Sequence, residues 1–353
     1  MEIDERFDKE KSNVLKGVAI LLLLFHHIFL EKERLIVNGV VLWDDLYDKC
    51  HPIVVAARIC VWIFVFISAY GLTIKYESGN KSVGQFIAGC WLNLMRQWWI
   101  VLIVMSILYQ LFVGNLFDFY GHSLQLWILD VFEWHDLFGQ PRILGSWYLC
   151  LAQLIILFIP LLSKFCRKYG LFSIAIFYVM SLFMGDGIVS TGGGAYWQYI
   201  PTVIGGVAVA QNGYLDKLLQ RRDKIWKNTL ECVILLAGIV VLSLLRTKMT
   251  DVNNFGGLLV LLIVFMLCIL FAKYFKHIHG VLRFFGKYSA VIFMTNVFFY
   301  INFPKIIYFT GNPIISYLTL IAVTLLCSIA IKYICEKTHY NKLFSFINRT
   351  LHL

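Results

Sequence analysis

Long apolar segments recur from one end of the chain to the other, and they constrain the fold more than any other feature of the sequence. Each is bordered by charged residues or by glycine and proline. Ten can be marked, at approximately 14–30, 53–74, 97–114, 143–162, 171–184, 196–210, 229–245, 255–271, 284–301 and 314–334. A helix needs about 20 mostly apolar residues to cross a bilayer. The pattern therefore predicts an all-α polytopic membrane protein, a bundle of about ten transmembrane helices.

The composition excludes several other classes of protein. The 353 residues are 59% hydrophobic and 15% charged, with a mean hydropathy of +0.74. Soluble domains are about 45–50% apolar and about 25% charged, so an ordinary cytosolic enzyme, a secreted disulfide module and a disordered regulator are excluded. An outer-membrane barrel is disfavoured by the high mean hydropathy. The nine cysteines show no CxxC or Cys/His spacing, so we expect buried thiols and no metal site.

The net charge of +10 separates into two faces. Most of the 31 lysines and arginines fall in alternate connecting segments, such as 164–168, 217–227 and 273–287. By the positive-inside rule, this alternation predicts that both termini are cytoplasmic, in a multi-pass protein of the cell membrane. The charge therefore requires no nucleic-acid partner. The outer segments instead carry acidic residues: Asp44, Asp45, Asp48, Asp118, Asp130, Glu133 and Asp136.

A single membrane domain is expected to occupy residues 1–353, because the sequence shows no internal repeat, low-complexity linker or soluble domain. The longest outer segment, 115–142, is aromatic and amphipathic. We expect it to lie along the outer surface, where it could cap a cavity for a substrate.

The first apolar segment contains ionisable residues, which are costly within a membrane and call for an explanation. Lys16 and His27 are eleven residues apart, which is about 16 Å along a helix and only about 20° from a whole number of turns. Both therefore share one helix face, while the neighbouring His26 points elsewhere. The spacing fits a cation and a proton acceptor serving one reaction. It fits equally well an interfacial histidine pair with Lys16 reaching toward the headgroups.

Five sequence motifs occur in the order in which one family of membrane enzymes carries them. The segment KGVAILLLLFHH, residues 16–27, resembles the first span of the acyltransferase-3 superfamily, where a basic residue precedes a histidine by the same interval. Further resemblances lie in a Phe-rich span, a Trp-aromatic-Leu helix ending in Pro-Leu-Leu, a Gly-Lys-x-Ser helix and the end of the last span. These are residues 61–76, 145–162, 286–300 and 335–337.

The resemblance implies an enzyme that moves an acyl group, commonly acetyl, from cytoplasmic acyl-CoA to a hydroxyl of a sugar or glycan. Acyl-CoA is then a donor substrate, and no cofactor is bound permanently. His27, with His26 as a second catalytic candidate, would act as a general base or as a transient acyl acceptor. The phosphates of coenzyme A would be held by the basic residues Lys16, Arg96 and Lys287.

The acceptor sugar, free or lipid-linked, is expected to enter from the outer side. The candidate residues that would contact it combine aromatic rings, hydroxyls, an amide, acids and a cation. They are Arg58, Ser68, Tyr70, Trp147, Tyr148, Asn296, Asp130 and Glu133. An interfacial aromatic belt and ordinary interhelical hydrogen bonds are the alternative explanations for most of them.

The sequence departs from the family pattern at several positions. Asn93 stands where the family often has the first arginine of Arg-x-x-Arg, Ala152 and Gln153 stand where an acidic residue is common, and Asn296 stands near a frequent histidine. Two other functions therefore stay open: a transporter or flippase of a lipid-linked glycan, and a catalytically impaired relative that acts as a membrane sensor or partner.

Overall fold

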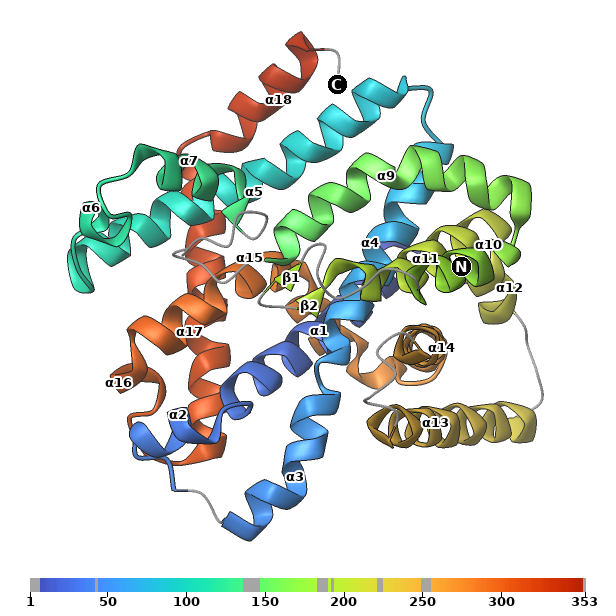
Figure 1. Ribbon diagram of the computed structural model, residues 1–353, viewed down its shortest axis with the longest axis horizontal. Coiled ribbons are helices and arrows are strands. Elements are labelled where there is room, and N and C mark those ends of the chain that lie inside the picture. The colour runs from blue at the N-terminus through green and yellow to red at the C-terminus, as the bar shows by residue number, and fades with distance from the viewer. Residues whose placement is uncertain are drawn as a thin grey trace.

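The computed structural model describes residues 7–41, 44–135, 147–182, 190–191, 194–220, 225–248 and 255–351. Its architecture is helical, and in the described ranges the strands are two residues long: β1 (Ser190–Thr191) pairs antiparallel with β2 (Gly194–Ala195). The long helices cross the molecule beside one another, and the short helices lie at their ends (Figure 1).

Seven segments in the described ranges are long and apolar enough to cross a membrane. A mostly apolar helix of about 20 residues matches the hydrocarbon thickness of a bilayer. The second of the seven, Tyr47–Glu77, joins α3 (Asp44–Ala56) to α4 (Ile59–Glu77). The other six lie in α1 (Lys9–Phe29), α5 (Val83–Phe112), α9 (Tyr148–Tyr169), α13 (Ile225–Lys248), α15 (His279–Asn302) and α17 (Pro313–Lys337).

Each of the ten apolar segments marked in the sequence overlaps a helix, but three of these helices are not among the seven candidates. They are α10 (Phe172–Leu182), α11 (Ile200–Asn212) and α14 (Phe255–Lys273). The first two have 11 and 13 residues, which is shorter than a perpendicular crossing needs. Seven candidate spans are therefore established, and the count of ten stays a prediction, as does the cytoplasmic placement of the termini.

Short helices connect the long ones. In the outer segment expected at 115–142, the structure has α6 (Leu116–Phe119) and α7 (Leu124–Phe132), beside the far end of α5 (Figure 1). Residues 136–146 lie outside the described ranges. The other short helices are α2 (Lys32–Val37), α12 (Tyr214–Leu219), α16 (Pro304–Ile307), the amphipathic α18 (Tyr340–Thr350), and the 3₁₀ turns η1 (Tyr196–Tyr199) and η2 (Lys276–Ile278).

The helices α1 and α15 lie in close contact, and two glycines permit this approach. A Cβ atom on Gly17 would lie 1.9 Å from the backbone oxygen of Leu282, and one on Gly286 would lie 1.8 Å from that of Asn13. Small residues at such contacts let membrane helices pack backbone to backbone. The glycine of the Gly-Lys-x-Ser motif therefore has a packing role.

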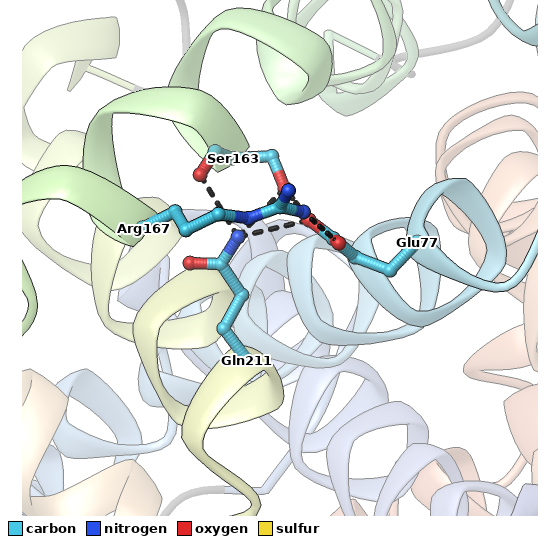
Figure 2. A network of polar contacts seen from close by, with 4 residues as sticks. All are labelled: Glu77, Ser163, Arg167 and Gln211. Carbon is cyan, nitrogen blue, oxygen red and sulfur yellow. Dashed lines mark hydrogen bonds and ion pairs between the residues drawn. The ribbon is translucent and has the colours of Figure 1, made fainter.

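A polar network joins α4, α9 and α11 (Figure 2). Glu77 accepts hydrogen bonds from the Ser163 hydroxyl at 2.5 Å and from the Gln211 amide at 2.9 Å, and it forms an ion pair with Arg167. Gln211 also donates to the Ser163 backbone oxygen at 2.8 Å. These contacts fix the ends of three helices relative to one another. We call these four residues the Glu77 clamp.

Candidate active site

His27 lies in the last turns of α1 and makes a hydrogen bond with a side chain on α15. Its Nδ1 atom is 2.6 Å from Oδ1 of Asn296. Because α1 is one continuous helix over Lys9–Phe29, Lys16 lies on the same face as His27, about 16 Å toward the start of the helix. The shared face of α1 expected from the sequence is thus present, and Asn296 of α15 contacts it at His27.

The contacts of Asn296 determine which atom of His27 carries the proton. The Asn296 side chain is fully buried, and its Nδ2 atom lies 2.6 Å from the backbone oxygen of Phe293 and 3.4 Å from that of Ile292. A carbonyl can only accept, so Nδ2 donates and Oδ1 is the acceptor facing His27. His27 therefore donates from Nδ1, and in the neutral ring its Nε2 atom carries the lone pair.

The packing of α1 on α15 sets this hydrogen bond. The residue pairs Gly17–Leu282, Asn13–Gly286 and His27–Asn296 all join the same two helices. At Gly17 and Gly286 no side chain separates the helices, so the two backbones approach closely there. His27 and Asn296 consequently meet although 269 positions separate them in the sequence.

Arg34 is a further residue of this site, and the sequence analysis did not identify it. Its Nη2 donates to the backbone oxygen of His27, and its Nη1 lies 3.2 Å from a carboxylate oxygen of Glu31. The guanidinium also sits 4.5 Å from the ring centre of Tyr300, whose ring is 6.1 Å from that of His27. The contact satisfies one of the last carbonyls of α1. An arginine seven positions after His27, between Glu31, Glu33 and the later acids Asp44, Asp45 and Asp48, was the available signal.

His26 has a different environment from His27. It is buried, and its Nδ1 donates to the backbone oxygen of Val54 on α3 at 2.8 Å. This bond ties α3 to the end of α1. The two histidine rings are 5.7 Å apart, but the contact of His26 is one that anchors a helix.

Ser68 and Tyr148 come together in the bundle interior. Their hydroxyls are 3.1 Å apart, and the Tyr148 ring centre is 5.3 Å from that of Phe293. Phe293 accepts the hydrogen bond of Asn296 one turn along α15. Trp147 packs against Tyr199 at 5.7 Å between ring centres. The structure therefore places Ser68 and Tyr148 beside the helix turn that holds Asn296.

Two other candidate residues, Tyr70 and Arg58, pack against aromatic rings away from the Ser68–Tyr148 pair. Tyr70 packs edge-on against Phe7, with ring centres 5.1 Å apart, near the start of α1. Arg58 precedes α4, and its guanidinium lies 5.9 Å from the ring centre of Trp62. These contacts place Tyr70 beside the residues that precede α1, and Arg58 beside a ring of α4.

Asp130 and Glu133 are buried at the end of α7. Asp130 accepts a hydrogen bond from the Tyr120 hydroxyl and lies 3.2 Å from His135. Burial and the neighbouring carboxylate raise the pKa of Tyr120. Oxygen or nitrogen atoms of Asp130, Glu133 and His135 lie within 4.8 Å of one another, so these three could hold a metal ion. The sugar contacts expected of Asp130 and Glu133 from the sequence stay a prediction.

The three cations expected to hold coenzyme A lie on three helices. Lys16 is half-buried on α1, Arg96 is half-buried on α5, and Lys287 is exposed on α15. The backbone oxygen of Arg96 accepts a hydrogen bond from the Tyr340 hydroxyl at 2.9 Å, which fixes the start of α18 to α5. Lys287 and Lys332 approach the ring of Tyr288 from α15 and α17.

Comparison with known protein families identifies the chain. The family model described as an acyltransferase domain matches residues 10–333, from the first turn of α1 to the last turns of α17. No curated protein and no solved structure matches the chain. The family match includes Lys16, His27 and Asn296, together with the glycines that bring α1 and α15 into contact. The chain belongs to the acyltransferase 3 family of membrane proteins.

Proposed function

We propose that this protein is a membrane O-acyltransferase that moves an acyl group from cytoplasmic acyl-CoA to a hydroxyl of a sugar or glycan. Family membership implies an acyl donor and an acceptor; acetyl as the acyl group and a carbohydrate as the acceptor are our proposal. The observation that carries it is the His27–Asn296 hydrogen bond of 2.6 Å between two helices of the bundle. It supplies a histidine with one ring nitrogen held and the other available for chemistry.

In the proposed reaction, the Nε2 atom of His27 takes the proton of the acceptor hydroxyl as its oxygen attacks the thioester carbonyl. The carbon–sulfur bond then breaks, and the coenzyme A thiolate leaves and receives a proton from the imidazolium. Asn296 accepts a hydrogen bond from Nδ1 throughout. That bond strengthens while the ring is positively charged, which favours the transition state.

An alternative route uses the same atoms. Nε2 attacks the thioester directly, the thiolate leaves, and the acyl group is transferred from the ring to the acceptor hydroxyl in a second step. Both routes need the same tautomer of His27. Detection of an acylated His27 peptide after reaction with donor alone distinguishes the second route from the first.

The position of each substrate follows from the ends of α1. Lys16, at the end near the N-terminus, is proposed to attract the anionic donor together with Arg96 and Lys287. His27 lies near the other end, where the acceptor is proposed to enter past Arg58, Trp147 and the Ser68–Tyr148 pair. Because Asp130 and Glu133 are buried, we do not assign them to the acceptor.

Asn296 also bears on whether the enzyme is impaired. The family often carries a histidine near this position, yet the amide here makes a well-oriented hydrogen bond to His27. This departure therefore retains a partner for the proposed base, which supports an active enzyme.

Mass spectrometry of surface glycans tests this proposal. Cells that lack the protein should lose acyl groups, wild-type protein should restore them, and His27→Ala should fail to restore them at equal membrane abundance. His122→Ala is the matched control, because His122 is an exposed outer histidine. The proposal of an enzyme is wrong if the acylation pattern is unchanged in cells that lack the protein. An accompanying accumulation of lipid-linked intermediates would indicate a transporter.

A further inference from the structure

A cavity of about 270 Å³ lies between the end of α4, the first turns of α5 and the helix α18. Side chains and backbone from the turn at 78–81 complete its wall. It is separate from the His27 site, and none of the residues assigned above to the donor or acceptor lines it. The lining residues are Lys75, Tyr76, Ser78, Gly79, Lys81, Gln85, Phe86, Gly89, Asn93 and Asn348.

The charge of this cavity is entirely positive. Lys75 and Lys81 contribute two cations, and none of the lining residues is acidic. The nearest carboxylate in sequence, Glu77, is engaged by Ser163, Arg167 and Gln211 in the Glu77 clamp (Figure 2). Within the described ranges neither lysine forms an ion pair, and the Lys75 ammonium donates to the Cys90 sulfur at 3.3 Å, which is a weak acceptor.

The lining of a second cavity, of about 240 Å³, differs from that of the first in its charged residues. It is also rich in cations, but Asp8 and Glu10 contribute to its lining. Its Arg283 lies 2.6 Å from Glu10 in an ion pair. The basic groups of the second cavity are thus partly neutralised by acids of this chain, whereas those of the first are not.

Uncharged groups of the first cavity also suit a nucleotide. The partly exposed ring of Tyr76 packs edge to face against the buried Phe86, with ring centres 5.0 Å apart, and it offers aromatic surface for a base. Asn348 of α18 contributes a buried Oδ1 without a hydrogen-bond partner in the described ranges, and Asn93 contributes a second amide. A lipid headgroup would use the cations but would leave these amides and rings without a matching group.

We propose that this cavity binds the phosphate groups of a nucleotide, and that Lys75 and Lys81 provide the charge that selects them. Resting on the proposed function, the nucleotide is the coenzyme A portion of the acyl donor. Cation–phosphate hydrogen bonds are charge-assisted and stronger than neutral ones. The two lysines therefore add to the cations that the sequence alone suggested for this task.

Ligand binding to the purified full-length protein in detergent tests the proposal. Isothermal titration would compare coenzyme A, adenosine 3′,5′-bisphosphate and pantetheine. The Lys75→Gln/Lys81→Gln double variant should bind both phosphorylated ligands at least about tenfold more weakly, with pantetheine binding unchanged. Lys276→Gln, in the second cavity, is the matched control and should bind all three ligands as the wild type does.

Three results would overturn the proposal. The first is unchanged coenzyme A affinity in the double variant, and the second is an equal loss of affinity in Lys276→Gln. The third is a double variant that loses only its binding to nanodiscs of anionic phospholipid, which would make the cavity a lipid site. The outcome is separable from the proposed function. Intact acyl transfer with unchanged binding refutes only the cavity assignment, while weakened nucleotide binding in a protein without transferase activity refutes only the proposed reaction.

Discussion

Two of the polar contacts between helices, the Glu77 clamp and the hydrogen bond between His27 and Asn296, differ in whether they leave a polar atom free to react. In the Glu77 clamp, one carboxylate receives bonds from Ser163, Gln211 and Arg167. In the pair formed by His27 and Asn296, a single bond of 2.6 Å engages Nδ1, and the described residues provide no hydrogen bond to Nε2. The clamp is therefore suited to stability, and the pair leaves a reactive atom available.

The difference also appears in the packing around each contact. The clamp joins the ends of three helices, and its arginine side chain is 68% exposed. The histidine pair lies between two helices whose glycines allow close contact, and Asn296 is fully buried. A change in the clamp should alter how firmly the helices associate. A change in the pair should alter the reaction before it alters the fold.

The strongest test of this contrast is His27→Gln, which replaces the imidazole with an uncharged amide. We expect the acyl-transfer rate to fall by about 10²- to 10⁴-fold, the range typical for loss of a general acid–base group. Radiolabelled acetyl transfer by the purified enzyme measures it, with thermal unfolding as the check on folding. A rate within a few-fold of wild type would remove His27 from the reaction.

Gly286→Ala should have the next largest effect. The new methyl group would meet the backbone of Asn13, so α1 and α15 must separate and the His27–Asn296 distance must change. Overpacking of this kind costs about 1–3 kcal/mol in stability, and a displacement of about 1 Å at a reacting group can cost about 10²-fold in rate. Gly280→Ala, on the same helix with open space around it, is the control and should behave as wild type.

Asn296→Ala should slow the transfer by about ten- to a hundredfold, the range found when a group that holds a functional histidine is removed. The effect should fall on kcat with KM unchanged, because Asn296 acts through His27. Asn296→His, which restores a ring capable of accepting the hydrogen bond, should recover part of the rate. An equal loss in Asn296→His and Asn296→Ala would contradict the positioning role.

Glu77→Gln should leave the rate of each folded molecule unchanged and lower the stability. Losing the charged acceptor of Ser163 and Gln211 should cost about 1–3 kcal/mol, while the exposed Arg167 contact adds little. Thermal unfolding in detergent measures the loss. Glu336→Gln is the control, because its contact with Lys332 is 3.8 Å long and exposed.

The helices were more predictable from the sequence than the site. Each apolar segment overlaps a helix because hydrophobic length is a local property, and the Lys16–His27 register follows from helix geometry alone. The short helices α10 and α11 show where this prediction of spans is limited, because apolar composition does not determine where a helix ends. Glycines such as Gly17 have meaning only once the opposing backbone is known.

The site was less predictable because its residues come together only through tertiary contacts. Asn296 was singled out as a departure from a family pattern, but its role as the partner of His27 depends on two distant helices meeting. Asp130 and Glu133 were expected to contact a sugar, and nothing in the sequence indicated that they lie in the interior beside a tyrosine and a histidine. Arg34 was overlooked because its contact is to a backbone atom.

A double-mutant cycle on His27 and Asn296 tests the central claim most directly. Transfer rates of the wild type, His27→Gln, Asn296→Ala and the double variant would be measured on folded protein. If the two residues act as one unit, Asn296→Ala should cause no further loss once His27 is gone, because coupled sites are not additive. A double variant whose loss equals the product of the two single losses would show independent residues and contradict the account.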